Sequence, residues 1–263
     1  MCCFSRPVRH VAKTKIFARS VIDQRQILAY AMDSAIDEEL AMVLPVPVPR
    51  ASSEDAVRFI DLSGYPKMLV ELDAAFPMMM AKSRSLFRMA PQSQSRSTLK
   101  VHDVGDFEAS FSPSRSDLDR LDERFTLPAH VWTQLSMYDD WGFVVCKLKP
   151  SGSWFSRLLG RTSWKTLHPM AFEFPTREPS KLFFPTMHVH DGEVHKTAEF
   201  DHSLIWQRGG SAMLEHASYD SEINAAVLGS SVNVAKTMGV IDPGEGAFRL
   251  LVSGELENAD TWV

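Results

Sequence analysis

The stretch Phe183-Phe184-Pro185-Thr186-Met187-His188-Val189-His190-Asp191-Gly192-Glu193-Val194-His195-Lys196-Thr197-Ala198-Glu199-Phe200 alternates apolar and polar residues on both sides of an Asp-Gly pair. Alternation with a period of two is typical of a β-strand, and Asp-Gly between two such runs is a strong hairpin signal. We therefore expect a hairpin with a two-residue turn at Asp191-Gly192. Such strands favour an antiparallel sheet over a helical fold.

Similar runs elsewhere predict the rest of the fold. The strands are expected at 8–19, 27–32, 40–48, 99–104, 107–111, 143–148, 170–174, 182–190, 193–206 and 248–252, and the helices at 54–76, 116–139 and 221–238. Three prolines at alternate positions in 44–49 predict an edge strand or an extended connector, because proline donates no ladder hydrogen bond. The predicted fold class is α+β, with mostly antiparallel sheets and a few peripheral helices.

The domain organisation is predicted from where this patterning stops. Residues 77–98 are rich in Met and then in Ser, Gln and Arg, without periodicity, so they are interpreted as a linker or mobile loop. They separate an N-terminal β-rich half with two helices, 1–76, from a C-terminal α+β half, 99–263. A strand ending in proline occurs in both halves, which is compatible with two related halves. Packing of both into one domain is the alternative.

Composition excludes several classes of protein. The chain has 263 residues, of which 44% are hydrophobic and 23% charged, as in globular proteins. The net charge of −5 gives no basic field for nucleic acid. No apolar run reaches the roughly 20 residues of a transmembrane helix. Three cysteines make a poor disulfide framework, so a reducing compartment, the cytoplasm, is expected. Nothing identifies a partner.

The predicted hairpin places four chemically active side chains on one face. With the turn at Asp191-Gly192, His190 faces Glu193 and His188 faces His195. Directly opposed residues point to the same side of a sheet, with Cβ atoms about 4.5–5.5 Å apart. Imidazoles at such positions can converge on Zn, Fe, Mn, Ni or Cu, with Glu193 as a fourth ligand or as a general base. His-x-His followed by Glu and His resembles the ligand chemistry of cupins, although the spacing departs from theirs.

The same pattern has a second interpretation. An antiparallel strand commonly buries one face and leaves the other in water. If Met187, Val189 and Val194 form the buried face, the histidines lie on the solvated one. The chain would then be a non-catalytic binding or structural module.

The start of the chain carries a third hypothesis. Removal of Met1 would expose an α-amine beside the Cys2 thiol, and this amine can act as the base for a nucleophile. A cysteine here, before a strand that ends in Arg19, resembles the choloylglycine hydrolase group, which implies an amidohydrolase. The residues on either side of Arg19, Ala18 and Ser20, differ from the small residue and the Asn of that group's motif. Cys2 and Cys3 as metal ligands, as lipid attachment sites or as an ordinary chain start are the alternatives.

Overall fold

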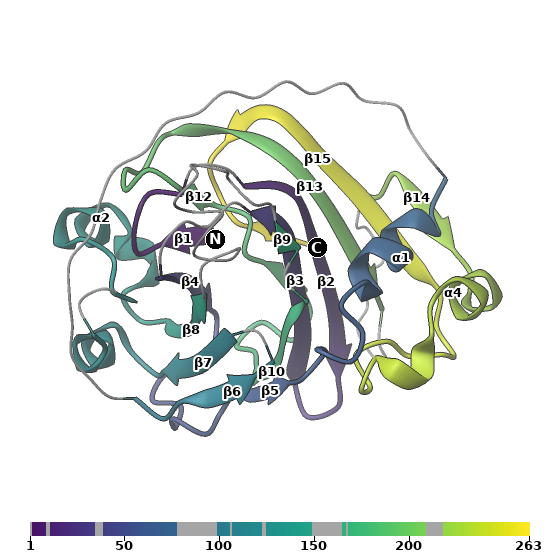
Figure 1. Cartoon of the computed structure of the whole chain (residues 1–263), viewed down its shortest axis with the longest axis horizontal. Coiled ribbons are helices and arrows are strands. Elements are labelled where there is room, and N and C mark those ends of the chain that lie inside the picture. Colours follow the sequence, from purple (N-terminus) through teal and green to yellow (C-terminus); the bar gives the residue numbers. More distant parts are fainter. Residues whose placement is uncertain are drawn as a thin grey trace, which may run out of the picture.

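The fold is known here from a computed structural model that describes residues 2–8, 11–34, 39–77, 99–105, 107–122, 125–148, 165–166, 168–208 and 218–263. Apart from Pro77, the predicted linker 77–98 lies outside these residues. Most of the described strands form two facing sheets, with helices on their outer faces (Figure 1). The division into 1–76 and 99–263 stays a prediction.

Sheet A takes the strand order β12-β1-β4-β8-β7-β6. The first strand of the chain, β1, lies inside this sheet between β12 and β4. It was not predicted from the sequence. The strands are β1 (Cys2–Phe4), β4 (Leu40–Val46), β6 (His102–Val104), β7 (Phe107–Ser112), β8 (Gly142–Leu148) and β12 (His188–Val189).

Sheet B takes the order β14-β15-β13-β2-β3-β10-β5, with β9 beside β3. The strands are β2 (Val11–Val21), β3 (Arg25–Ser34), β5 (Arg58–Ile60), β9 (Lys165–Thr166), β10 (Met170–Pro175), β13 (Thr197–Gln207), β14 (Ser221–Ile223) and β15 (Ala247–Glu257). A separate pair, β11 (Phe183–Phe184) and β16 (Thr261–Trp262), is antiparallel.

The predicted α+β class is confirmed, but the sheets are mixed. Most neighbouring strands are antiparallel, whereas β1 pairs with β12 and β2 with β13 in parallel. Strands brought together from distant parts of the sequence are not constrained by a hairpin, so they can pair in either direction.

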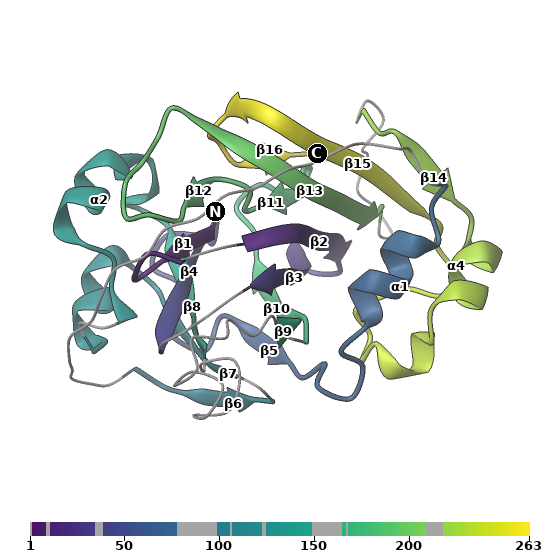
Figure 2. The same cartoon turned by 45° about the horizontal axis from the view of Figure 1, so that its top comes forward.

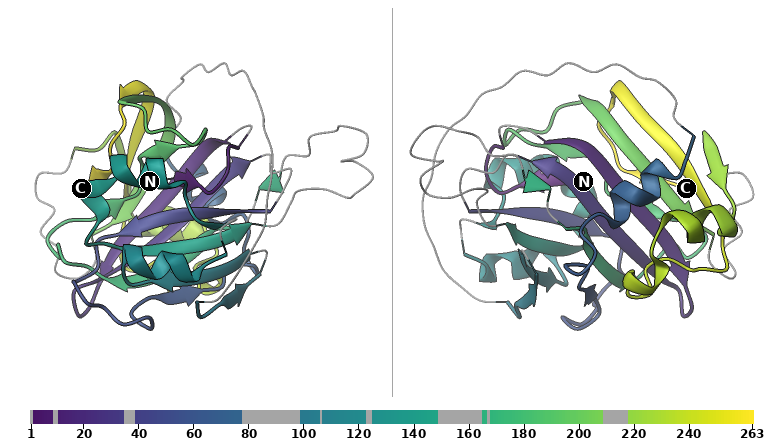
Figure 3. Two further views of the ribbon diagram at one scale, coloured as in Figure 1. Left: turned by 90° about the vertical axis from the view of Figure 1, so that its left-hand side faces the viewer. Right: turned by 45° about the vertical axis from the view of Figure 1, so that its right-hand side comes forward.

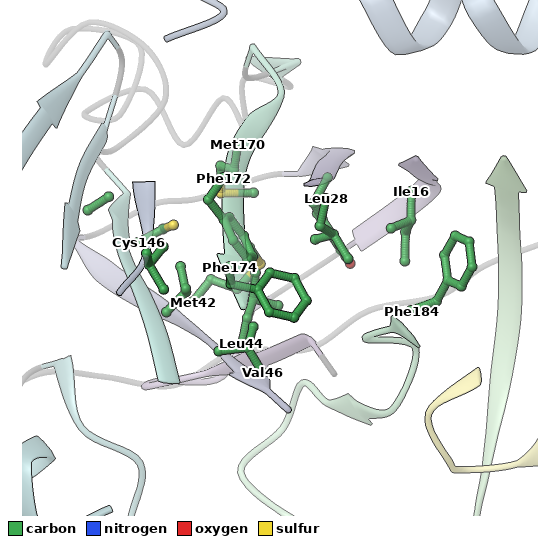
Figure 4. Packing of buried hydrophobic residues seen from close by; sticks show 14 of the residues in the cluster. Ile16, Leu28, Met42, Leu44, Val46, Cys146, Met170, Phe172, Phe174 and Phe184 are labelled. Atoms are coloured by element: carbon green, nitrogen blue, oxygen red, sulfur yellow. The ribbon is translucent and has the colours of Figure 1, made fainter. Parts of the chain in front are cut away.

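The main hydrophobic core fills the space between the two sheets. Met42, Leu44 and Cys146 enter it from sheet A, and Leu28 and Phe172 from sheet B (Figure 4). These side chains are at most 1% exposed. Complete burial of a side chain such as Leu28 or Phe172 contributes about 1.5–3 kcal/mol, so the two sheets stabilise each other chiefly by this contact.

Helices cover the outer face of each sheet. Over sheet A lie α2 (Ala129–Gln134) and the 3₁₀ helices η1 (Arg115–Arg120) and η3 (Ser136–Tyr138), joined to the sheet by a second apolar cluster. Over sheet B lie α1 (Met68–Ala74), α4 (Ala225–Ser231) and the 3₁₀ helix η4 (Val234–Lys236), which are seen in front of the strands in Figure 3. No helix within the described ranges is long and apolar enough to cross a membrane.

All three predicted helices differ in the structure, and the one expected at 116–139 is divided into η1, α2 and η3. Residues 58–60 of the predicted helix 54–76 form β5, which pairs with β10. Arg58 is opposite Glu173 there, and the two side chains form an ion pair. The predicted helix 221–238 begins with β14, so the helical part starts only at Ala225. In both places a long-range strand pair overrides the local apolar spacing.

The proline-rich strand β4 is not at the edge of sheet A, because β1 and β8 lie on either side of it. The β1 ladder covers only Met42 and Val43 of β4. Pro45 lies outside this ladder and pairs with Phe143 of β8. At Pro45 only one side of β4 is paired, so this part of the strand is locally an edge. A proline fits there because it has no N–H to donate to a second neighbouring strand.

Candidate functional site

The Asp191-Gly192 turn is present, but the hairpin around it is not. Gly192 has a φ of +87°, and the Glu193 N–H donates to Asp191 Oδ1 at 3.1 Å. The residues before the turn form β12, which pairs with β1, and β13 begins only at Thr197 and pairs with β2 and β15. The predicted register, in which His188 faces His195, is therefore wrong.

Two of the four predicted ligands lie on the exposed turn. His195 Nε2 is 2.8 Å from Asp191 Oδ2, and the His195 side chain is 59% exposed. Glu193 Oε1 is 3.5 Å from Nε2 of His130, a residue of α2. His195 and Glu193 are thus engaged by separate neighbours, Asp191 and His130.

The other two predicted ligands, His188 and His190, are half-buried and lie beside His202, a buried histidine that was not predicted as a ligand. His188 Nε2 is 2.9 Å from His202 Nε2. The ring of His188 stacks on His190 at a centroid distance of 4.5 Å and on Phe200 at 4.6 Å. We call His188, His190, Phe200 and His202 the histidine junction.

The histidine junction joins the two sheets. His188 belongs to β12, the edge strand of sheet A, and His202 belongs to β13 of sheet B. The parallel ladder between β13 and β2 begins only at Ser203, so His202 lies just beyond it. Figure 1 shows the first half of β13 running past β2 towards β12. The imidazole pair therefore links β12 to the part of β13 that lies beyond the ladder between β13 and β2.

Burial keeps the two linked imidazoles neutral. Loss of solvation is the main cause that lowers the pKa of His188 to about 2, followed by the neighbouring His190 and His202. Loss of solvation likewise lowers the pKa of His202 to about 3. At neutral pH one ring can donate and the other accept in the Nε2 to Nε2 hydrogen bond, as neutral imidazoles do.

The prediction of a metal-binding function is wrong for this arrangement. No group of three His, Cys, Asp or Glu side chains among the described residues could hold a metal ion. His188, His190, His195 and Glu193 would have converged only across a paired hairpin, and residues 190–196 form a loop. Without the ladder, nothing fixes these side chains at a common distance.

The other sequence hypothesis, Cys2, lies in the same region. Cys2 is the first residue of β1, and its Cα partner in β12 is His188. The Val8 N–H donates to the His190 carbonyl at 3.0 Å, which extends this contact beyond β1. The two sequence features are thus neighbours through a parallel strand pair. A nucleophilic role for Cys2 stays a prediction.

An asparagine that sequence reasoning missed fixes the free edge of β12. Asn258 Oδ1 accepts from the His188 N–H at 2.7 Å, and its Nδ2 donates to the carbonyls of His188 and His195 at 2.9 and 3.0 Å. Its burial at 6% exposure is the mark of a structural role. No local pattern around Asn258 or His202 signals these contacts, because each spans a distance in sequence that only the fold closes.

Comparison with known proteins yields similar folds only. No family model and no curated protein matches the chain. The crystal structure of baculovirus P35 has a TM-score of 0.44 and 12% identity, covering 99% of this chain and 98% of that one. A mutated baculovirus P35 after caspase cleavage gives 0.42 and 13%, covering 96% and 97%. The caspase-8/P35 complex gives 0.44 and 12%, covering 95% of each chain.

Proposed function

We propose that this chain is a non-catalytic binding module whose partner is another protein. The observation that carries the proposal is the use of the histidines. His188 and His202 bond to each other inside the junction between the sheets, while His195 and Glu193 are engaged separately on the turn. These side chains hold strands and loops in place, which is what a rigid binding scaffold needs.

The described thiols agree with a non-catalytic role. Cys3 and Cys146 are both buried. Burial raises the pKa of Cys146 to about 12, so its side chain stays a thiol at neutral pH. The thiolate is the nucleophilic form, and reactive cysteines have partly exposed, electropositive surroundings that lower the pKa. Cys146 accordingly belongs to the apolar core, where it packs between the sheets.

Binding and catalysis are separated by two measurements on the full chain. The binding probe is caspase-8, which is bound to P35 in the complex described above. Biolayer interferometry with immobilised full chain is expected to give a saturable complex with a dissociation constant in the micromolar range or below, about −8 kcal/mol or better. A panel of N-acyl amides, incubated with the chain alone, is expected to show no turnover.

The matched control for the catalytic alternative is Cys2→Ser. Wild type and this variant are expected to behave alike in the amide assay, and mass spectrometry of the mature chain reports whether Met1 is retained. Turnover that disappears in Cys2→Ser would replace the proposal with an N-terminal nucleophile. Absence of any complex with caspase-8 up to about 100 μM, weaker than about −5.5 kcal/mol, would count against a protein-binding role towards this probe.

A further inference from the structure

The last six residues run antiparallel along 182–188, and we call residues 258–263 the strap. Its end is held by main-chain bonds: the Leu182 N–H donates to the Val263 carbonyl at 2.7 Å, and the Val263 N–H to the Leu182 carbonyl at 2.9 Å. Phe183 then pairs with Trp262 in β11 and β16. Figure 2 shows the end of the chain beside β11. The strap thus begins as an added strand.

Nearer to β12 the strap uses side chains where a strand would use its backbone. Asp260 Oδ1 accepts from the Met187 N–H at 2.9 Å. The Asn258 amide both accepts from the N–H of His188 and donates to its carbonyl, which reproduces the two bonds of an antiparallel residue pair. Main-chain groups of another extended segment could therefore form the same hydrogen bonds with the N–H of Met187 and with the N–H and carbonyl of His188.

An aromatic side chain anchors the strap. The Trp262 ring lies 5.0 Å from the centroid of Phe183 and 6.2 Å from that of Trp141, in tilted and edge-to-face geometry. Beside them the Tyr138 hydroxyl donates to Asp260 Oδ2 at 2.6 Å. Burial, followed by the Asp260 charge, raises the pKa of Tyr138, so this donor keeps its proton. A tryptophan in an aromatic surround is the usual anchor of a protein–protein contact.

Exposure differs sharply between the strap and the edge beneath it. Phe183, Phe184 and Thr186 are fully buried. Ala259 is exposed, and residues 260–263 of the strap are only half-buried. Asn258 at the start of the strap is buried, whereas residues 259–263 are more exposed than the edge that they cover. More exposed segments at the surface of a fold open at lower free energy than its core.

We propose that the edge formed by residues 182–188 is a docking site for an extended segment of a partner protein, and that the strap occupies this site from within the chain. The partner segment carries the chemistry of the strap: Asn or Asp side chains two positions apart, and an aromatic residue four positions after the first. Such strand addition gains affinity from main-chain bonds and specificity from the side-chain anchor. The inference rests on the proposed function, because it supplies the docking site of the binding module.

The test uses the full chain and a synthetic peptide with the sequence of residues 257–263, Glu-Asn-Ala-Asp-Thr-Trp-Val, labelled at its amino end. The variant Asn258→Ala/Trp262→Ala removes the amide bonds and the anchor from the internal strap. Fluorescence anisotropy is expected to show at least tenfold tighter peptide binding to this variant than to wild type, where the attached strap competes at an effective concentration in the millimolar range. The control is Val70→Ala, at a side chain that is exposed on α1. This variant should behave as wild type.

Hydrogen exchange supplies the second readout. Amides of residues 187 and 188 should exchange at least tenfold faster in the double variant than in wild type and slow again when the peptide is added. Peptide binding no tighter than that of a scrambled peptide, or unchanged exchange at these amides, overturns the proposal. If the double variant lacks the native circular dichroism spectrum, Trp262→Leu alone is held to the same two criteria. No partner protein enters this test, so its failure leaves the binding of caspase-8 to be decided separately.

Discussion

His188 and His202 share a hydrogen bond that only certain protonation states allow. An imidazole nitrogen accepts only when it carries no proton, so two protonated rings at 2.9 Å between Nε2 atoms would repel each other. His202 is buried, at 2% exposure, and His188 is half-buried. His190 and Phe200 both stack on the ring of His188. The junction is therefore built for neutral histidines.

This protonation state makes stability depend on pH. The pKa values of His188 and His202 fall from 6.5 to about 2 and about 3, so between these values the unfolded chain binds protons that the folded chain does not. Stability is fully present above pH 6.5 and is lost as pH falls, by up to about 1.4 kcal/mol per pH unit for each histidine. Urea unfolding between pH 7.5 and 4 measures this slope.

The control for the pH experiment is His188→Gln/His202→Gln, which retains every carboxylate of the wild type. Its free energy of unfolding should depend less steeply on pH, and the difference between the two slopes belongs to the histidines. Equal slopes would mean that the pair titrates normally in the folded protein. His202 is not among the predicted ligands, and its contact with His188 depends on the fold. Neither this pair nor its pH dependence was therefore predictable from the sequence.

At the scale of elements, α1 is too short to be stable by itself. It has seven residues, and no side chain caps its N-terminus. Isolated helices of this length are unstable in water, so tertiary contacts must hold it. Arg249 of β15 does so from the sheet: its Nη1 donates to the Asp73 carbonyl at 3.1 Å and its Nη2 to the Pro77 carbonyl at 2.6 Å. Its guanidinium also lies 4.9 Å from the centroid of Phe76.

We expect Arg249→Met to release the end of α1. The change removes the donors to two carbonyls and one partner of the Asp73 carboxylate, which is 25% exposed and keeps Ser203 and Lys15. Loss of one member of a buried ion pair costs about 3–5 kcal/mol, and the partial exposure and remaining partners of Asp73 reduce this to about 2–3. Urea unfolding gives the total, and hydrogen exchange at residues 68–77 locates it.

The same chemical change at an exposed ion pair is the control. Arg58 is 59% exposed and shares Glu173 with Arg25. Arg58→Met should cost less than about 1 kcal/mol, because exposed pairs contribute little and Glu173 keeps Arg25. A loss for Arg249→Met no larger than this would show that α1 is held by apolar packing alone.

Prediction from the sequence succeeded for elements whose pattern is local. The apolar run 143–148 became β8, and the last part of the predicted helix 54–76 became α1. It failed where pairing is long-range. The three residues of β1 carry too short a pattern to identify a strand, and the partner of β12 is β1, more than 180 residues away, instead of the segment just past the Asp-Gly turn.

At the scale of the whole molecule, the two sheets meet around the core at two places where side chains, and no backbone ladder, make the contact between strands. We call these two places seams. One is the histidine junction between β12 and β13. The other lies between the edge strands β5 and β6, where Phe59 packs on His102 at a centroid distance of 5.2 Å. There His168 Nε2 is 3.1 Å from the Val104 carbonyl, which ties the end of β6 to the residues before β10. Side chains, and histidines in particular, therefore close both seams.

The second seam can be tested at Gly105, which follows β6 with a φ of +59°. A Cβ at this position would lie 2.4 Å from His168 Nε2 and 2.7 Å from Ser63 Cβ, both closer than atoms can approach. Gly105→Ala therefore pays for the left-handed backbone, about 1 kcal/mol, and for displacing a buried ring, about 1–3 kcal/mol more. Urea unfolding and the Nε2 chemical shift of His168 should both change.

Gly192→Ala separates the two contributions. Gly192 also has a positive φ, +87°, but no atom lies within 4 Å of a Cβ built on it. The free energy of unfolding of Gly192→Ala should fall only by the backbone contribution of about 1 kcal/mol, and the His168 signal should stay unchanged. The excess loss in Gly105→Ala then measures how tightly the seam between β5 and β6 is packed. Equal losses in the two variants would mean that His168 and Ser63 move aside freely, and that the core between the sheets, and not the seam, holds this side of the molecule closed.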